Sequence, residues 1–313
     1  KRQAIDNPDT GRVEYRFDPA GNLIAKLTPN LGPSRAIVYR YDHNRLTDID
    51  YPDSADVAYV YGVDTPQMRQ DNRVGRIVSI ANGDLMEERF YGELGETVKT
   101  VKSIRSDIPS RAWPVYTTRY LYDYFGRLRQ LTYPDGEVLT YGYDQGGLLE
   151  SARGEKGGRQ YDYLLDLAYD EFGQRVRLQL GNGVATTYSY DPETRRLDHL
   201  LTLGAGGEVL QNIDYGYDKV GNVLSLTNSA FVTRDFVART VTQTFGYDDL
   251  HRLDWAKGTY AIGGDHLDKH DSDFAYDTIG NFTAKTQTHW YEDPLTGSRS
   301  LRPHTSYAFD YRY

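Results

Sequence analysis

The sequence contains no cysteine, only two methionines and three tryptophans, and no apolar run that approaches the roughly 18 residues of a membrane span. The absence of cysteine excludes a disulfide scaffold, a thiolate zinc site and a cysteine nucleophile, but it does not fix a cellular compartment. With 45 acidic against 36 basic residues the formal net charge is -9, which disfavours binding to nucleic acid or to an anionic membrane. Thiol chemistry, a membrane span and a nucleic-acid partner are therefore not expected.

Tyrosine is the residue in excess, with 28 positions against 10 phenylalanines, while 30 glycines and 12 prolines supply material for turns. Tyrosine favours β-strands, because its ring packs across a pleated surface while its hydroxyl can stay hydrated. No sustained helical periodicity is present. The composition therefore predicts an all-β fold of short antiparallel strands, with helix confined to short turns.

One motif recurs along the chain. It consists of an aromatic residue, any residue, a second aromatic residue and Asp, followed by two residues, Gly, Arg or Asn, and an aliphatic residue. The clearest copies begin at Tyr15, Tyr120, Tyr215 and Phe274, and further copies begin at Tyr39, Tyr141, Leu167, Tyr188, Phe245 and Tyr307. A degenerate copy, Phe90-Tyr91-Gly92 followed by Gly95, lacks the Asp. From Asp123 onward, successive motif aspartates lie 21 to 33 residues apart, which fits two short strands and two turns per repeat.

Each motif position has a physical reason. Aromatic residues at i and i+2 place both rings on one face of a strand. The Asp can start a turn by accepting hydrogen bonds from main-chain N–H groups two residues on, and Gly fits a position with positive φ, which we expect at Gly126 and Gly221. A second turn closes the far end of the unit, at sequences such as Pro134-Asp135-Gly136. The repeat is therefore predicted to be a β-hairpin, and residues 1–313 a single array that is most degenerate at about 62–112.

The sequence Tyr122-Asp123-x-x-Gly126-Arg127-Leu128, with Tyr133-Pro134-Asp135-Gly136 as its partner turn, resembles the YD repeat of the Rhs family. That family includes the B and C components of bacterial Tc toxins, bacterial Rhs effectors and animal teneurins. The resemblance runs from about Tyr15 to the C-terminus. It implies a repeat array of antiparallel β-hairpins forming a curved, spiralling sheet, the wall of a hollow shell that holds a C-terminal toxin segment.

On this resemblance the chain is expected to be a fragment of a longer bacterial protein, secreted or at the cell surface, and a non-catalytic piece of shell wall. Its expected partners are an encapsulated polypeptide and the remainder of the parent shell. Family members also carry a core-associated box at which self-cleavage releases the toxin. Asp18-Pro19-Ala20-Gly21 has the form of such a box but lies in a repeat turn, and Asp293-Pro294-Leu295-Thr296-Gly297 is one residue too long. Self-cleavage is therefore not expected.

Two other functions fit parts of the sequence. Paired carboxylates carry out acid–base chemistry in glycoside hydrolysis, but a catalytic pair would be unique, whereas these aspartates recur at every turn. Exposed tyrosine rings could stack on sugars, so a cell-surface carbohydrate-binding or adhesion module is the alternative function. Packing of the rings within the strip is the preferred interpretation. Self-association through unpaired edge strands is also expected for an array cut from a longer spiral.

One local cluster, from Gly264 to Asp273, has ligand-like chemistry. His266 and His270 are four residues apart, which on a helix would place both on one face, and the neighbouring aspartates could offer oxygen ligands to calcium. No helix is otherwise expected there and the spacing fits no calcium loop, so we interpret the segment as a polar insertion between strands. Asn281-Phe282-Thr283 matches a glycosylation acceptor, but Asn281 fills the Arg/Asn position of a repeat. No catalytic residue, metal or cofactor is expected.

Overall fold

The computed structural model describes residues 1–7, 11–32, 35–108, 112–230, 240–262 and 266–312. Within these ranges 25 β-strands alternate with turns. Among the described residues, helix is limited to α1 (Pro66–Gln70) and two 3-10 turns, η1 (Pro29–Leu31) and η3 (Pro303–Thr305). The predicted all-β fold with helix only in short turns is confirmed. Over the described ranges, no helix has the length and hydropathy needed to cross a membrane.

The chain divides into two compact units, residues 1–141 with 154–160 and residues 142–153 with 161–313. The strands that begin in the first part of the chain are β1 (Ala4–Asn7), β2 (Gly11–Phe17), β3 (Leu23–Leu27), β4 (Ala36–Asp42), β5 (Arg45–Asp50), β6 (Val57–Tyr61), β7 (Ile77–Ala81), β8 (Leu85–Tyr91), β9 (Thr97–Ile104), β10 (Val115–Tyr122), β11 (Leu128–Thr132) and β12 (Val138–Tyr143). The later strands are β13 (Leu149–Lys156), β14 (Arg159–Tyr169), β15 (Arg175–Leu180), β16 (Ala185–Tyr190), β17 (Leu197–Leu203), β18 (Val209–Tyr217), β19 (Val223–Asn228), β20 (Val241–Tyr247), β21 (Leu253–Ile262), β22 (His266–Tyr276), β23 (Phe282–Glu292), β24 (Arg299–Leu301) and β25 (Tyr307–Asp310). That residues 1–313 form a single array stays a prediction.

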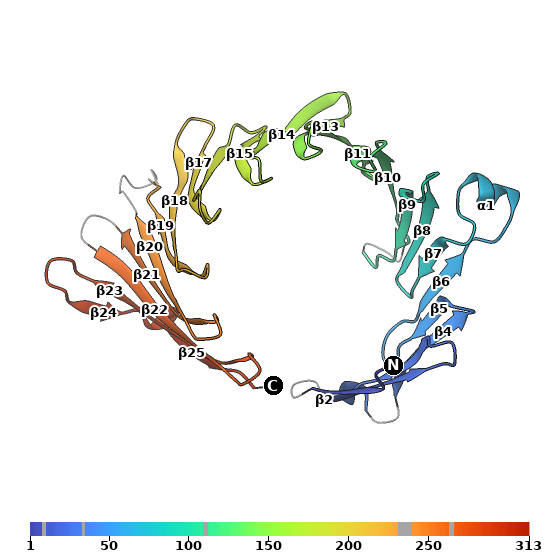
Figure 1. Ribbon diagram of the computed structural model, residues 1–313, viewed down its shortest axis with the longest axis horizontal. Helices are drawn as coiled ribbons and strands as arrows, with labels where there is room; N and C mark the ends of the chain where they lie inside the picture. The colour runs from blue at the N-terminus through green and yellow to red at the C-terminus, as the bar shows by residue number, and fades with distance from the viewer. Residues whose placement is uncertain (8–10, 33–34, 109–111, 231–239, 263–265, 313) are drawn as a thin grey trace. The chain divides into compact units, whose positions relative to one another are not determined.

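Within each unit, neighbouring strands of the ribbon pair antiparallel, as β10 does with β9 and β11, and β22 with β21 and β23. At the end of the chain, β24 and β25 both pair with β23. Each unit is a curved, single-layered ribbon of sheet (Figure 1). Because no second layer covers it, the described part of the chain has no fully buried large side chain. Its buried apolar residues are Ala25, Val78, Ala152, Leu167, Ile213 and Ala230.

The motif turns join each even-numbered strand from β2 to β22 to the next odd-numbered strand, so within a unit they all lie along the same rim of the ribbon. The second turns of the repeats lie along the opposite rim. Gly126 has a φ of 75° and Gly221 a φ of 108°, so the predicted left-handed positions are confirmed. In copies that lack the glycine, a different residue takes a positive φ in the turn, such as His251 at 60°.

A β-bulge recurs beside the motif turn. In the β10–β11 hairpin, Leu121 pairs with Gln130 and Tyr122 with Leu128, so Arg129 is an extra residue on the returning strand. The same one-residue shift of the strand register occurs directly before the last motif residue of the first strand in further hairpins. These hairpins begin with β2, β4, β6, β8, β14, β16, β18, β20 and β22. A bulge bends its strand and increases the local twist. The ribbon is therefore bent at the same place in each of these repeats.

The predicted degenerate region retains the main-chain hydrogen bond of the motif turn. Gly92 takes the place of the Asp, and its N–H donates to the carbonyl of Glu96 over 2.8 Å, as the N–H of Asp123 donates to Arg127. Between β6 and β7, Gly62 donates to the carbonyl of Arg76 over 2.9 Å in the same way. The two residues that normally separate Asp and Gly are replaced there by a longer segment that contains α1. The motif has thus been interrupted by an insertion rather than lost.

Candidate functional site

The carboxylate of each motif Asp accepts hydrogen bonds from groups of its own turn. Asp123 accepts hydrogen bonds at Oδ1 from the N–H groups of Phe125 (2.9 Å) and Arg127 (3.0 Å), and at Oδ2 from Nε of Arg127 (2.7 Å). Asp218 accepts from three successive N–H groups at Oδ1, and from the Asn222 amide at Oδ2 over 2.7 Å. The position after the motif Gly can be either Arg or Asn, because either side chain can donate to the second carboxylate oxygen.

These hydrogen bonds change the acidity of the carboxylates. Burial acts to raise the pKa of Asp218, but the hydrogen bonds from Asn222 and the turn amides outweigh it and hold the pKa below its ordinary value of 3.8. At Asp248 the hydrogen bond from the Arg252 N–H is the largest cause of a lowered pKa. The pKa is lowered likewise at Asp18, Asp123, Asp170, Asp191 and Asp277. Carboxylates held in the ionised form in this way are poor candidates for a general acid.

The second aromatic residue of the motif links one repeat to the preceding one. Tyr217 donates its hydroxyl hydrogen bond to the carbonyl of Leu197 over 2.8 Å, Tyr247 to Val223 over 2.9 Å, and Tyr276 to Leu253 over 2.8 Å. Each acceptor is the first residue of the strand that returns from the preceding motif turn. Tyr91 and Tyr190 make the equivalent bonds to Ile77 and Arg175. The same contact thus recurs between successive repeats.

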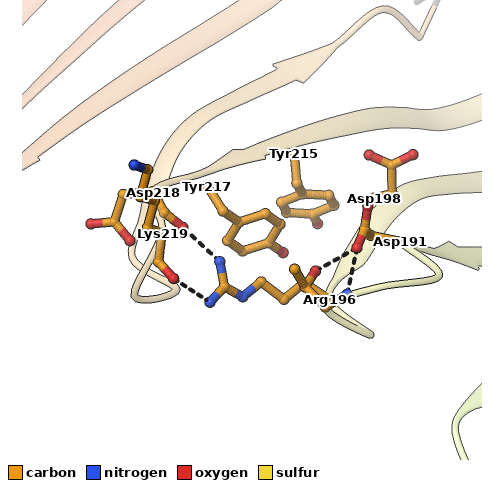
Figure 2. A pocket seen from close by; sticks show the side chains of 8 residues that line it. Asp191, Arg196, Asp198, Tyr215, Tyr217, Asp218 and Lys219 are labelled. Atoms are coloured by element: carbon orange, nitrogen blue, oxygen red, sulfur yellow. Dashed lines mark hydrogen bonds between the residues drawn. The ribbon is translucent and has the colours of Figure 1, made fainter.

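A hollow of about 450 Å³ lies at one such joint, between the motif turns that begin at Asp191 and Asp218. Figure 2 shows Arg196 reaching across it, with its guanidinium donating to the carbonyls of Asp218 (2.6 Å) and Lys219 (3.2 Å). The rings of Tyr215 and Tyr217 line the hollow side by side, with centroids 6.4 Å apart. Its charged groups are largely committed to the two turns, so the hollow is the joint between two repeats.

A second polar cluster lies on β22 and β23, where Asp268, His270 and His289 come together. Nε2 of His289 lies 2.8 Å from Oδ1 of Asp268, and its Nδ1 is hydrogen-bonded to the hydroxyl of Thr305. His270 pairs with His289 across the two strands. Burial lowers the pKa of His270, the charge of His289 lowers it further, and Asp271 and Asp268 oppose the shift. Asp268 and Ser272 are buried, and their side chains lie on the face that carries the motif aromatics.

This cluster corrects the interpretation of residues 264–273 as a polar insertion. Residues 266–273 lie inside β22, an 11-residue strand, while 263–265 lie outside the described residues. The polar residues fit a strand because Asp268, His270 and Ser272 face polar partners on β23. Along a strand, positions 266 and 270 are roughly 13 Å apart, too far for both to bind one ion. In the part of the chain that the structure describes, no group of three such side chains could hold a metal ion.

The remaining candidates from the sequence are parts of turns. Asp18 accepts from the N–H and side chain of Asn22 at 2.7 and 2.9 Å, as the other motif aspartates do. Asp293 accepts from the N–H groups of Leu295 and Thr296 in the turn between β23 and β24. The Asn281 amide donates to Asp277 over 3.0 Å. The sequence reasoning missed the tyrosine-to-carbonyl contacts, although the preference for Tyr over Phe directly before the Asp was a signal for them.

Comparison with known proteins identifies the repeat. The family described as "RHS Repeat" matches residues 116–160. Toxin subunit YenC2 of Yersinia entomophaga is 30% identical over 232 residues, which is 66% of this chain and 24% of that protein. Toxin subunit YenC1 of the same organism is 37% identical over 152 residues, 46% of this chain and 16% of that protein. The chain therefore spans about a quarter or less of the length of these relatives.

The fold has a close counterpart among solved structures. The crystal structure of TcdB2-TccC3 superposes with a TM-score of 0.81 at 22% identity, covering 99% of this chain and 16% of that one. This likeness extends over both units, beyond the residues that the family match covers. The predicted fold class and the recognition of the repeat are both confirmed.

Proposed function

Since the chain is an array of Rhs repeats, we propose that it forms part of the wall of a hollow shell that encloses a polypeptide. The observation that carries this proposal is the contact between Tyr217 and Leu197 and its counterparts, which recurs between successive repeats. Such a contact makes consecutive hairpins into one continuous wall. The toxin subunits among the relatives support the same conclusion, because they carry the repeat in much longer chains.

The single-layered sheet supports a wall rather than a globular domain. A globular domain of this length would bury large side chains in a core, whereas the described residues have none that is fully buried. Leu121 and Val60, each between two motif tyrosines and therefore on the opposite face of the sheet from them, are large apolar side chains left exposed on the strands. Apolar surface of this kind marks a face that meets another polypeptide. A cargo held against the wall would cover it.

A non-enzymatic role is part of the proposal. The motif carboxylates are committed to hydrogen bonds within their turns, as at Asp123 and Asp218, and their lowered pKa values favour the ionised form. This arrangement supports a structural role for the most frequent chemical group of the repeat. We further propose that the protein acts outside the cell that makes it, as a component of a secreted toxin.

Electron microscopy and protease protection of the full-length protein that contains this array test the proposal. We expect a hollow particle whose enclosed polypeptide resists a protease concentration that digests it once the wall is opened. The triple variant Y217F/Y247F/Y276F, which lacks three bonds between repeats, should lose that protection. The matched control is Tyr124→Phe, because the Tyr124 side chain is fully exposed. A solid particle, or a wild-type protein whose interior is digested at the same rate as the opened one, would contradict the proposal.

A further inference from the structure

The pairing along one edge of β23 is interrupted at His289. On that edge β24 pairs with Trp290–Glu292 and β25 with Ala284–Gln287, and the 3-10 turn η3 lies between the two short strands. There the main-chain N–H of His289 donates to Oγ of Ser306 over 3.0 Å, and its carbonyl accepts from the N–H of Arg302 over 2.7 Å. The turn η3 is therefore fixed beside His289, in the place where an edge strand would otherwise pair.

This arrangement places the hydroxyl of Thr305 against the imidazole of His289. Nδ1 of His289 is hydrogen-bonded to that hydroxyl, and its Nε2 lies 2.8 Å from Oδ1 of Asp268. Gln287 holds Thr305 from its main-chain side, because its Nε2 donates to the Thr305 carbonyl over 2.9 Å. Thr305 is exposed, whereas the side chains of His289 and Asp268 keep only 12% and 6% of their exposure. An exposed hydroxyl is thus backed by a nearly buried imidazole and carboxylate.

The hydrogen-bond roles follow from the chemistry of the three groups. A carboxylate oxygen can only accept, so in the neutral imidazole Nε2 carries the hydrogen and Nδ1 keeps its lone pair. The Thr305 hydroxyl is then the donor to Nδ1. The carbonyl of Arg302, 3.4 Å from Oγ1 of Thr305, is a more distant acceptor. The proton of the hydroxyl therefore points at a base that a carboxylate orients, which is the arrangement of an activated nucleophile.

A purely structural role does not explain the carboxylate. The turn η3 is already held by the hydrogen bonds of Arg302, Ser306 and Gln287. Burying a charged pair costs free energy of desolvation, and an apolar pair of similar volume is often at least as stable. A buried carboxylate–imidazole pair beside an exposed hydroxyl is what activation of that hydroxyl requires. The cluster therefore points to chemistry at Thr305.

We propose that Thr305 is a nucleophilic modification site that takes an acyl group from an activated ester. Oγ1 of Thr305 forms a bond to the acyl carbon while its proton passes to Nδ1 of His289. The bond between the acyl carbon and the leaving oxygen breaks, and the departing alcohol takes the proton from His289. Asp268 acts through the imidazole, which it orients and whose cationic form it stabilises.

The product of this step is an ester on the chain itself. The step therefore modifies the wall once per chain and requires no turnover. It goes beyond the proposed wall function and does not depend on whether anything is enclosed.

Reaction of the purified chain with 4-nitrophenyl acetate at pH 8 tests the proposal. Absorbance follows the released 4-nitrophenolate, and tandem mass spectrometry locates the acetyl groups and times their appearance at each residue. We expect Thr305 to be acetylated, and His289→Gln to slow this acetylation by roughly 100-fold, because a general base contributes at least that much. Thr305→Val should abolish it and Thr305→Ser should retain it. Since Thr305 is exposed, neither variant disturbs a buried group.

Two matched controls separate activation from exposure. Thr288→Val removes an exposed hydroxyl of the same strand, and His304→Gln removes an exposed imidazole next to Thr305. Both variants should acetylate Thr305 at the wild-type rate. Asp268→Asn should slow the reaction, with a circular dichroism spectrum that shows the chain still folded.

The pH profile provides a readout that a structural role of the cluster would not change. Acetylation of Thr305 should fall between pH 8 and pH 5, because a protonated imidazole cannot accept the hydroxyl proton. In H289Q the slow remaining reaction should lose this dependence. A wild-type chain without acetyl on Thr305, equal rates at Thr305 and Thr288, or an unchanged rate in H289Q would each overturn the proposal.

Discussion

The hydroxyl of Tyr217 donates a hydrogen bond to the main-chain carbonyl of Leu197, 20 residues earlier in the chain and one repeat back. Burial raises the pKa of this hydroxyl, so the group stays protonated and can serve as a donor throughout the neutral range. Tyr91, Tyr190, Tyr217, Tyr247 and Tyr276 make this contact, each directly before the Asp of its motif or, at Tyr91, before the Gly that replaces it. The contact explains the preference for Tyr over Phe directly before the Asp of the motif.

Replacing Tyr217 with Phe removes this hydrogen bond and keeps the ring. We expect the free energy of unfolding to fall by about 0.5–1.5 kcal/mol, because the carbonyl of Leu197 loses its donor in a half-buried place. Urea denaturation of the purified chain measures this loss. Tyr124→Phe, at a fully exposed position, is the matched control and should change nothing. Equal stability of both variants would show that the contact is not a structural link.

The motif glycines should differ in their tolerance of a side chain. Both Gly126→Val and Gly221→Val place a β-branched residue at positive φ, which costs about 1–3 kcal/mol of folding free energy. A Cβ on Gly126 meets no other atom within 4 Å, whereas one on Gly221 lies 3.1 Å from the Arg196 guanidinium. We therefore expect G221V to be the less stable of the two in urea denaturation. A G126V chain as stable as the wild type would mean that the turn is not strained by the substitution.

Acid should unfold the array through the motif carboxylates. Their folded-state pKa values lie below the ordinary 3.8, so they contribute stability that is present above pH 3.8 and is lost as the pH falls through the lowered values. Thermal denaturation between pH 6 and pH 2.5 measures this slope. The variant D218N/D277N should be less stable at neutral pH and should show a shallower slope below about pH 4. An identical slope in both proteins would assign acid unfolding to other groups.

A milder acid effect is expected around His270. Its folded-state pKa is lower than its ordinary value of 6.5, so the native state resists protonation. Stability attributable to this group is present above pH 6.5 and is lost as the pH falls below that value. Hydrogen exchange of β22 and β23 should therefore quicken between pH 7 and pH 5, after correction for the intrinsic rate. His270→Gln cannot titrate and should remove this pH dependence. A pH response that persists in H270Q would show that His270 is not its source.

The sequence alone predicted the repeat, its period, the all-β fold and the positions of the motif turns. These features could be predicted because they depend on residues a few positions apart. The turn of Asp218, Gly221 and Asn222 is completed within five residues, so the residue types alone indicate its hydrogen bonds. The same locality explains why the degenerate turn at Gly92 could be recognised by its glycine spacing without its Asp.

Only the tertiary structure shows which contacts join each hairpin to its neighbour. The partner of Tyr217 is 20 residues away, and that of His289 is 21 residues away at Asp268, so both contacts depend on the register between strands. The recurring bulge sets part of that register, and no residue type marks it in the sequence. The segment around His270 looked like a loop because it is polar, yet it is a strand whose polar side chains lie beside polar partners on β23, such as His289. Burial and pairing between strands are properties of the assembled sheet, and a one-residue shift of register would turn every side chain of a strand to the other face.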